Sequence, residues 1–381
     1  MDFQASPWMN AELELYKDNV RRFIKAQVVP YQEKWRSQHY VDRALWRKAG
    51  ELGLLLADIP EQYGGSGGTF AHMSVFWEEL IAADETGIGT HVHSVVAHYI
   101  LNSGTEAQKM AYLPRLANGE LIAAIAVTEA GAGSDLQGIR TAAVRRDDYF
   151  VINGSKTFVS NGTLADLVLL AVKTDPAAGA RGISVFLLET KDLQGYRVGR
   201  ILEMIGRRAQ DTSEVFLDDV KVPVEALLGG VEGRGVSQLG KGLAYERIAI
   251  GVAAVAAMER ATALAVEYTR ERKAFGKPLF DLQNTRIKLA EAKTQSVVAR
   301  VFIDWCIHKM ISGTMEPDVA SMAKWYLSDM QCKLIDECLQ LFGGYGYSME
   351  FPIARMYADA RVQKIYGGAN EVMKEIIAYA I

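Results

Sequence analysis

Three glycine-rich segments of the sequence combine hydroxyl, aromatic and cationic side chains that could hold a flat, phosphate-bearing ligand. In the first, residues 126–135 (AVTEAGAGSD), glycines would let backbone N–H groups approach an anion, and Ser134 offers a hydroxyl to a phosphate. It is not a dinucleotide fingerprint, because Leu136 stands where the third glycine belongs. Taken alone, an ordinary glycine turn explains this segment about as well.

The second segment, residues 152–162 (INGSKTFVSNG), predicts a turn at Asn153-Gly154 followed by a strand with Phe158 and Ser160 on one face. An aromatic ring beside a hydroxyl suits a flat ligand with a hydrogen-bonding edge. A solvent-facing hairpin with an incidental phenylalanine is the competing interpretation, and it comes first for this segment in isolation.

The third cluster comes from two breaks between predicted helices, residues 272–279 (RKAFGKPL) and residues 340–346 (QLFGGYG), together with Gln283. Arg272 offers a guanidinium, which is well suited to pyrophosphate. A plain helix terminus, ended by glycine and proline, explains the first break equally well.

These segments lie in an order of helices, strands and again helices. Over residues 11–116 apolar residues recur at helical spacing, with breaks at Pro30, at residues 60–68 and at Gly104. Over about residues 121–224 the pattern changes to short β-branched and aromatic runs (YFVI, DLVLLAV, GISVFLLE and SEVFL), which predict strands of a small sheet or barrel. The second segment therefore lies among strands, and the first lies at their border with the helices.

After Gly235 four helices are predicted, separated by breaks that hold the last prolines of the chain. In the second of these helices, five apolar residues at helical spacing predict a buried bundle face without a chemical role: Ile287, Ala290, Val297, Val301 and Trp305. His91 and His93 point in different directions on a helix, so helix surface or pocket lining is expected rather than a metal site.

Composition excludes several other classes. The 381 residues are 49% hydrophobic, enough for two or three domains, and a net charge of -4 gives no basic excess for binding nucleic acid. We expect no membrane insertion, because the apolar run over residues 248–257 is too short to span a bilayer. Three cysteines match no zinc spacing, so no metal is expected. Without an export signal, a reducing, cytoplasmic location is predicted, with a processed mitochondrial matrix form as the alternative.

In their order and combination these segments resemble the acyl-CoA dehydrogenase family. The resemblance covers nearly the whole chain and rests on PEQYGG, VTEAGAGSD, INGSKTFVSNG, GISVFLLE, GRRAQDTSEVFLDDVKVP, ERKAFGKPL, QLFGGYGY and ARVQKIYGGANEVMKEI. It implies an α+β fold, mainly α, with an N-terminal helical domain (residues 1–120), a middle β-sheet or barrel domain (residues 121–230) and a C-terminal four-helix bundle (residues 231–381). It also implies dehydrogenation of a fatty acyl-CoA thioester to the trans-2-enoyl-CoA.

The resemblance implies an FAD held between the middle domain and the bundle. The isoalloxazine would stack near Phe158, where the family often has Trp, and would hydrogen-bond to Thr128 and Ser160. Ser134 would lie by the pyrophosphate or the CoA. The remaining cofactor contacts, most of them to the FAD of a neighbouring subunit, are Arg272, Phe275, Gln283, Gln340, Gly343, Gly344, Ala369 and Glu371. A homo-oligomer is therefore expected, and the family's usual form is a homotetramer.

The implied reaction needs a carboxylate to take the α-proton, because a thioester α-C–H is a weak acid. In many members this carboxylate follows the tyrosine of an IYEGT motif, whereas this chain has Gly367 there and Ala369 in place of the usual Thr. Two interpretations follow, an inactive paralogue or a base from elsewhere. Residues 243–247 (LAYER) resemble the isovaleryl-CoA and long-chain branches, whose base lies early in the first bundle helix, and this implies Glu246 as the base.

The same resemblance implies Arg247 near the CoA and Tyr366 at the substrate. Gly367 keeps its backbone N–H, which would polarise the thioester carbonyl as an oxyanion hole does. Without the resemblance, an ordinary helical glutamate would be the better interpretation of Glu246, since the chain has 46 acidic residues. Burial beside an acyl chain would raise the Glu246 pKa, so activity is expected to rise toward alkaline pH.

The motifs ASMAKWYLSDMQ and IYGGANEVMKEI look closest to the long-chain branch, which implies a long straight or branched acyl-CoA and a role in fatty acid β-oxidation. Gly87, Gly89 and Ala97 would leave room in the acyl pocket, or would equally serve helix packing. Short branched substrates such as isovaleryl-CoA, an acyl-CoA oxidase and a carrier-protein thioester are alternatives. The family implies an electron-transferring flavoprotein as acceptor. A non-catalytic flavin-binding scaffold is the alternative from another class.

Overall fold

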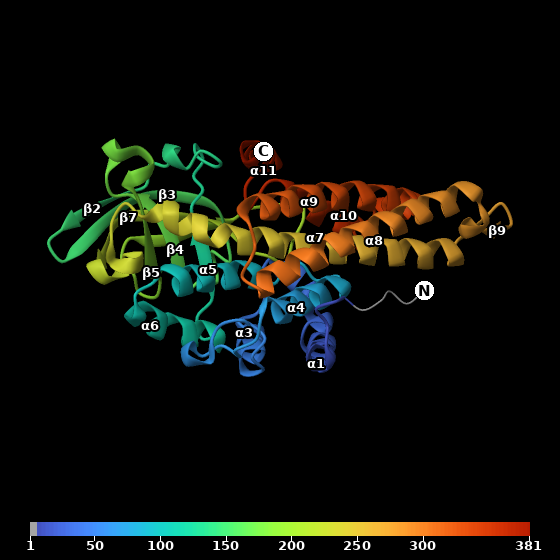
Figure 1. Ribbon diagram of the computed structural model, residues 1–381, viewed down its shortest axis with the longest axis horizontal. Coiled ribbons are helices and arrows are strands. Elements are labelled where there is room, and N and C mark those ends of the chain that lie inside the picture. The colour runs from blue at the N-terminus through green and yellow to red at the C-terminus, as the bar shows by residue number, and fades with distance from the viewer. Residues whose placement is uncertain (1–5) are drawn as a thin grey trace.

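The computed structural model describes residues 6–381, and its parts follow the predicted order of helices, strands and helices (Figure 1). The prediction that the chain has no export signal rests partly on residues 1–5, which lie outside the described residues. The described N-terminal domain is helical, as predicted. Its α-helices are α1 (Ala11–Gln27), α2 (Gln32–Gln38), α3 (Arg43–Glu51), α4 (Phe70–Ala82), α5 (Thr90–Ser103) and α6 (Glu106–Ala117).

Local sequence sets the boundaries of these helices where the breaks were predicted. Pro30 lies in a 3-10 turn, Val29–Tyr31, between α1 and α2, and Gly104 ends α5 with an extended backbone. One residue later Thr105 begins α6 by exchanging hydrogen bonds with Gln108, each side chain accepting from the other residue's backbone N–H. The short connection makes α5 and α6 neighbours against the sheet.

The middle domain is a curled sheet. Its strands are β1 (Ala123–Ala126), β2 (Ala142–Arg146), β3 (Tyr149–Ser160), β4 (Leu167–Lys173), β5 (Ile183–Glu189), β6 (Tyr196–Ile201) and β7 (Thr212–Pro223). They pair in the order β1-β4-β2-β3-β7-β6, and β5 pairs with β4. Alternate residues such as Phe150, Ile152 and Phe186 fill the interior of the sheet. The predicted runs are confirmed as β3, β4, β5 and β7, whereas β1, β2 and β6 carry no such run.

The prediction of a turn at Asn153-Gly154 is wrong. Strand β3 continues through both residues, and the register shift there places the extra residue on β7, between Leu217 and Val220. The chain reverses instead near Asp147, which adopts a left-handed φ of 43° before β3. A second register shift precedes Val159, so Phe158 and Ser160 do not follow plain strand alternation.

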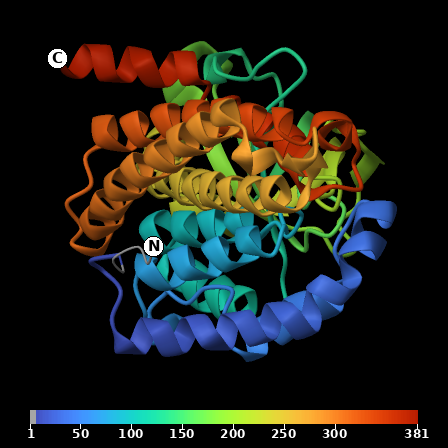
Figure 2. The same cartoon turned by 90° about the vertical axis from the view of Figure 1, so that its right-hand side faces the viewer.

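The C-terminal helices are α7 (Gly235–Glu271), α8 (Gln283–Ile311), α9 (Pro317–Gln340), α10 (Pro352–Ala360) and α11 (Asn370–Ala380). Helices α7 to α10 run side by side as the predicted bundle, and α11 crosses over α9 at the top of the view (Figures 1 and 2). The strands β8 (Lys273–Ala274) and β9 (Lys277–Pro278) form the tip between α7 and α8. Helix α7 is apolar and long enough to cross a membrane, but most of its apolar part is buried inside the protein, as in a core helix.

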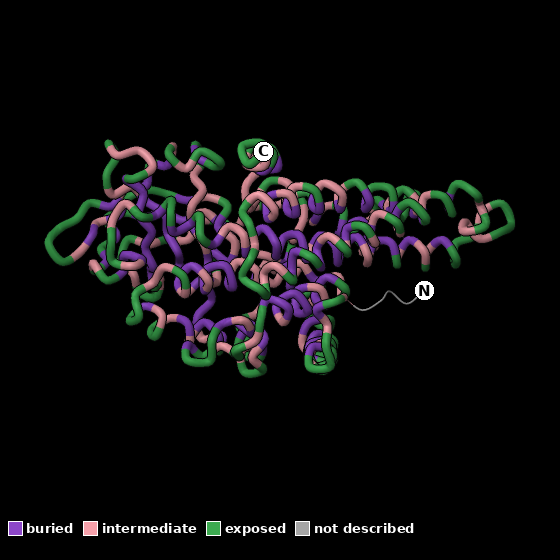
Figure 3. Tube along the Cα trace, in the orientation of Figure 1, coloured by how far each residue is buried: buried purple, intermediate pink, exposed green. Residues whose placement is uncertain are grey.

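The predicted buried face of α8 is wrong. Val301 is 66% exposed and Trp305 is 48% exposed, while Ile287 on the same side is 49% exposed. The buried side of the helix consists instead of Leu289, Thr285, Ala292, Ser296, Ala299 and Ile303. Small residues on that side allow α8 to approach α7 closely, so the larger apolar residues are left outside in a single chain. Figure 3 shows buried residues along α7 and exposed ones at the tip between α7 and α8.

Arg300 joins the N-terminal domain to the bundle. From α8 it donates to both carboxylate oxygens of Glu259 on α7, at 2.9 and 2.8 Å, and it pairs with Glu78 of α4 at 2.5 Å. Burial raises the pKa of Glu78, and the Arg300 charge opposes that rise. One guanidinium therefore holds three helices that come from two domains.

We predict that Arg300→Met lowers the free energy of unfolding by about 3–5 kcal/mol, because it leaves the Glu78 and Glu259 carboxylates without their cation. Lys288→Met on the same helix is the matched control, since its exposed pair with Glu337 should contribute less than about 1 kcal/mol. Urea denaturation measures both changes. Equal midpoints for the two variants would contradict the role given to Arg300.

Candidate active site

The Glu246 carboxyl group lies beside a glycine turn. Glu246 projects from the first part of α7, and a Cβ atom at position 367 would lie 3.5 Å from its Oε1 and 2.5 Å from Cδ1 of Ile250. Gly367 has φ +63° and Gly368 has φ +90°, conformations that side-chain-bearing residues rarely adopt. The carboxyl group therefore lies in contact with the glycine turn, and it is Ile250 that leaves no room for a side chain at position 367.

Buried charges surround this carboxyl group. Burial raises the pKa of Glu246, while the charges of Arg247 and Lys324 act in the opposite direction. Arg247 is only 5% exposed and donates to the Ser321 hydroxyl on α9 at 3.0 Å. Glu246 is thus a weakly acidic group, held by α7 close to the loop that precedes α11.

Tyr366 lies next to the glycine turn. Its phenol is enclosed, and burial raises the Tyr366 pKa. The guanidinium of Arg207 lies 5.3 Å from the centre of the Tyr366 ring, on its face. Arg207 comes from the loop before β7, has φ +53° and donates its backbone N–H to Asp359 on α10. The middle domain therefore reaches the turn through a residue that the sequence did not single out.

A buried ion pair supports the first glycine-rich segment, residues 126–135. Lys156, fully buried in β3, donates to Glu129 Oε1 at 2.7 Å and to the Val127 carbonyl at 3.0 Å. Glu129 also accepts from the backbone and hydroxyl of Thr141. Neither charge was predicted as part of the site. The signal was available, because Lys156 shares the inward face of β3 with Phe150, where a lysine needs a partner.

This pair leaves the predicted ligand residues of the segment open. Ser134 is exposed and Thr128 is half-buried, and a Cβ on Gly131 or Gly133 would meet no atom within 4 Å. The Thr128 carbonyl accepts from the Thr157 N–H at 2.9 Å, which joins the first segment to the second. The structure thus brings the two segments together.

Phe158 presents an aromatic face at this junction. It is 57% exposed, and its φ of +56° is an outlier for a bulky residue. Such strain is concentrated at ligand sites, where the surrounding structure sustains it. Ser160 is half-buried two residues later. An open ring beside hydroxyl groups fits a flat, planar ligand with polar edges.

The third predicted cluster lies at the other end of the molecule (Figure 1). Arg272 stacks over the Tyr345 ring at 5.8 Å, which brings the two predicted breaks together at the tip of the bundle. Phe275 is 91% exposed there with φ +56°. The exposed residues of this tip cluster include Arg272, Phe275, Gln283, Gln340, Gly343 and Gly344. One chain therefore does not bring the tip cluster to Phe158.

Ala369 and Glu371 lie at the start of α11, directly after the glycine turn. Ala369 is half-buried at the N-cap position and Glu371 is exposed in the first turn. These two residues therefore belong with Gly367 and Glu246 rather than with the tip cluster.

Of the two interpretations left open for the small residues near α5, the contacts of Gly87 and Gly89 favour packing. A Cβ on Gly87 would lie 2.8 Å from the Ala209 carbonyl carbon, and one on Gly89 would lie 2.7 Å from Nδ2 of Asn161. Both neighbours belong to the middle domain, so the glycines allow the two domains to meet. Ala97 is fully buried.

The two histidines of α5 are neutral structural groups. His93 contacts the Leu116 carbonyl and the Ala123 N–H. His91 packs edge-on against Trp77, and burial together with the Arg207 charge lowers its pKa to about 4. Within residues 6–381 no group of three metal-ligating side chains includes either histidine.

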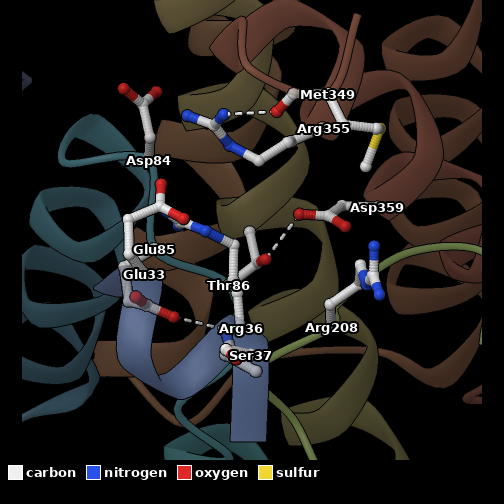
Figure 4. Close-up of a pocket in the computed structure, with 12 residues that line it drawn as sticks. Glu33, Arg36, Ser37, Asp84, Glu85, Thr86, Arg208, Met349, Arg355 and Asp359 are labelled. Atoms are coloured by element: carbon white, nitrogen blue, oxygen red, sulfur yellow. Dashed lines mark hydrogen bonds and ion pairs between the residues drawn. The ribbon is translucent and has the colours of Figure 1, made fainter. Parts of the chain in front are cut away.

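A cavity of about 230 Å³ lies where α2, the segment before α5, the loop before β7 and α10 meet (Figure 4). Arg36 pairs with Glu33 beside it. Thr86 donates to Asp359 at 2.6 Å. Burial raises the pKa of Glu85 in its wall to about 7. The lining is charged and, of the residues considered for the site, includes only Gly87, so this cavity does not suit an acyl chain.

Comparison with known proteins identifies the chain. Residues 10–120, 124–220 and 233–381 match the N-terminal, middle and C-terminal domains of acyl-CoA dehydrogenases. The mitochondrial long-chain specific acyl-CoA dehydrogenase of Rattus norvegicus is 44% identical over 98% of this chain and 87% of the relative. The acyl-CoA dehydrogenase structure from Geobacillus kaustophilus has a TM-score of 0.95 and 41% identity, covering 99% of both chains.

A glutaryl-CoA dehydrogenase from Mycobacterium smegmatis, solved in complex with FADH2, has a TM-score of 0.91 and 28% identity over 99% of this chain and 96% of that chain. These relatives thus differ in the substrates they are named for, and one of them is named with a bound flavin. The open Phe158 ring and the unobstructed glycine segment fit such a flavin. This protein belongs to the acyl-CoA dehydrogenase family of FAD-dependent oxidoreductases.

Proposed function

We propose that this protein dehydrogenates long-chain acyl-CoA thioesters between the α and β carbons, with Glu246 as the base. One observation carries the proposal: Oε1 of Glu246 lies 3.5 Å from the position that a Cβ of residue 367 would occupy. A carboxylate from α7 thereby reaches the place that the family motif usually fills from the loop. The non-catalytic alternative has no use for an acid at this half-buried position, where desolvation of the carboxylate costs free energy.

The residues around the turn would divide the chemistry between them. Glu246 would take the α-proton, and the backbone N–H of Gly367 would polarise the thioester carbonyl as negative charge develops on its oxygen. FAD, when bound, accepts the hydride from the β carbon. Thr128 and Ser160 would hydrogen-bond the flavin edge, with Phe158 against its ring. Arg247 would offer positive charge toward the CoA, and Ser134 would bind its phosphates or those of FAD.

The long-chain assignment rests on similarity. The relative at 44% identity acts, by its name, on long-chain acyl-CoA. Short branched substrates, a carrier-protein thioester and direct oxidation by oxygen are the alternatives. An electron-transferring flavoprotein is the proposed electron acceptor, and release of peroxide with oxygen alone would instead identify an oxidase.

A homo-oligomer would complete the cofactor site, and the homotetramer is the form that the family resemblance implies. The tip cluster lies at the end of the bundle, away from the sheet that carries Phe158, so the tip of a second copy would have to supply Arg272, Phe275 and their neighbours. The exposed apolar side of α8, with Val301 and Trp305, suits burial between copies.

We predict that Glu246→Gln abolishes flavin bleaching by acyl-CoA, with the reduction rate falling by about 10²–10⁴-fold, because the amide cannot accept the α-proton. Bound FAD and the affinity for the CoA thioester should persist. Glu267→Gln, an exposed glutamate on the same helix, is the control and should bleach normally. Stopped-flow absorbance of the flavin measures both, and bleaching at the wild-type rate in Glu246→Gln would exclude this residue as the base.

The rate of flavin reduction should increase with pH through the raised pKa of Glu246. Only the carboxylate accepts a proton, so the reaction is slow below this pKa and reaches a plateau above it. The midpoint should lie above about 4.3, the ordinary value for glutamate. Stopped-flow reduction across a pH series provides the measurement. A rate that stays flat from about pH 5 to about pH 9 would show that no base with a raised pKa takes part.

Substrate preference should increase with chain length. With butyryl-, octanoyl- and palmitoyl-CoA, kcat/KM is expected to be highest for palmitoyl-CoA, by about tenfold or more over butyryl-CoA, because each buried methylene contributes about 0.8 kcal/mol. A dye-coupled assay measures the series, with isovaleryl-CoA included. The best turnover with butyryl- or isovaleryl-CoA would replace the long-chain assignment with a short-chain one.

A further inference from the structure

Lys324 is a fully buried lysine in α9 that no sequence motif singled out. Its Nζ donates to the Gly368 carbonyl at 2.6 Å and to Oδ1 of Asn370 at 2.8 Å. It stands within the buried stripe of α9, between Ala320 and Leu327. A lysine in such a stripe loses its hydration, so it must be compensated by specific partners.

The partners of Lys324 are Gly368, which ends the glycine turn, and Asn370, the first residue of α11. Gly368 has φ +90°, and the bond from Lys324 fixes the direction of its carbonyl. Asn370 is itself fixed, because its amide donates to Ser328 at 3.1 Å and to the Trp325 carbonyl at 3.4 Å. Lys324 thus ties the turn to α9 from the inside of the protein.

Lys324 also contributes charge to the surroundings of Glu246. The charges that act on Glu246 or Lys324 include Arg247 on α7 and Glu371 on α11. Glu246 in turn raises the pKa of Tyr99 on α5 and of Tyr366 in the loop, and the His91 ring on α5 hydrogen-bonds to the Glu246 backbone. Burial and the Arg247 charge lower the pKa of Lys324 to about 8, and Glu246 and Glu371 oppose that fall. Near neutral pH it is therefore a cation, which favours the carboxylate form of Glu246.

We propose that Lys324 is a positioning residue for dehydrogenation: it fixes the Gly367-Gly368 turn, whose N–H would polarise the thioester carbonyl, and keeps a positive charge beside Glu246. The inference rests on the proposed function of Glu246 and Gly367. A purely structural lysine would stabilise the fold without influencing the protonation of the base, and this difference makes the two roles separable.

The test compares Lys324→Met with Lys324→Arg in the FAD-loaded enzyme. Lys324→Met should slow flavin reduction by about 10- to 100-fold with little change in KM, because the turn is displaced. In Lys324→Met, the midpoint of the rise in reduction rate with pH should lie about one pH unit higher than in the wild type, because a cation near the base is lost. Lys324→Arg keeps the charge, so its midpoint should equal that of the wild type. Its reduction rate should lie between those of Lys324→Met and the wild type.

Hydrogen exchange gives a readout independent of turnover. Amides of residues 365–371 should exchange faster in Lys324→Met than in the wild type, because the Gly368 carbonyl loses its donor. Lys333→Met on the same helix, whose exposed side chain pairs with Asp329, is the matched control and should leave rate, pH profile and exchange unchanged. Should Lys324→Met only lower the melting temperature, with wild-type rate and pH profile, the positioning role would be overturned.

Parallel measurement of Glu246→Gln separates the two proposals. If Glu246→Gln fails to bleach while Lys324→Met behaves as the wild type, the Lys324 inference alone is wrong. If Glu246→Gln bleaches normally, the proposed base is wrong, and the exchange of residues 365–371 still decides whether Lys324 holds the turn.

Discussion

The rest of the site depends on the close packing of the glycine turn, residues 367–368, against α7. A Cβ on residue 367 would lie 2.5 Å from Cδ1 of Ile250, which is too close, and 3.5 Å from Oε1 of Glu246, which is ordinary contact. Gly367 and Gly368 therefore allow a left-handed turn that lies against Ile250, with the Glu246 carboxyl group in contact beside it. Burial of that acid is unfavourable, and the charges of Arg247 and Lys324 offset part of the cost.

The surrounding helices and the middle domain hold the Glu246 carboxyl group and the glycine turn in place relative to each other. Helix α7 is the buried centre of the molecule, and Arg300 joins it to α4 and α8. The middle domain approaches through Arg207, which rests on Tyr366. The same architecture sends the tip of the bundle away from the sheet, so a chain that holds its own proposed base presents half of its proposed cofactor residues elsewhere. This division is the physical reason for proposing that copies of the chain share their sites.

The sequence predicted the order of the layers because helical spacing and β-branched runs are local signals. It missed β1 and β6, whose alanines, glycine and arginines carry no strand pattern. The buried side of α8 was assigned wrongly, because Ala292 and Ser296 are buried by close helix contact while larger residues face outward. Lys324 and Arg207 lie within quoted motifs, but their roles could not be read from them, since each acts through a backbone contact or a ring far away in sequence. The neighbourhood of Glu246 and Gly367 was anticipated only through the family resemblance.

The most direct test of the central claim follows the proton itself. The FAD-loaded protein is incubated in D2O with palmitoyl-CoA and without an electron acceptor, and deuterium at the α carbon is measured by mass spectrometry. The wild type should exchange the α-proton, whereas Glu246→Gln should fall to the background of the enzyme-free solution, because no other group would remove that proton. Exchange at the wild-type rate in Glu246→Gln would contradict the account.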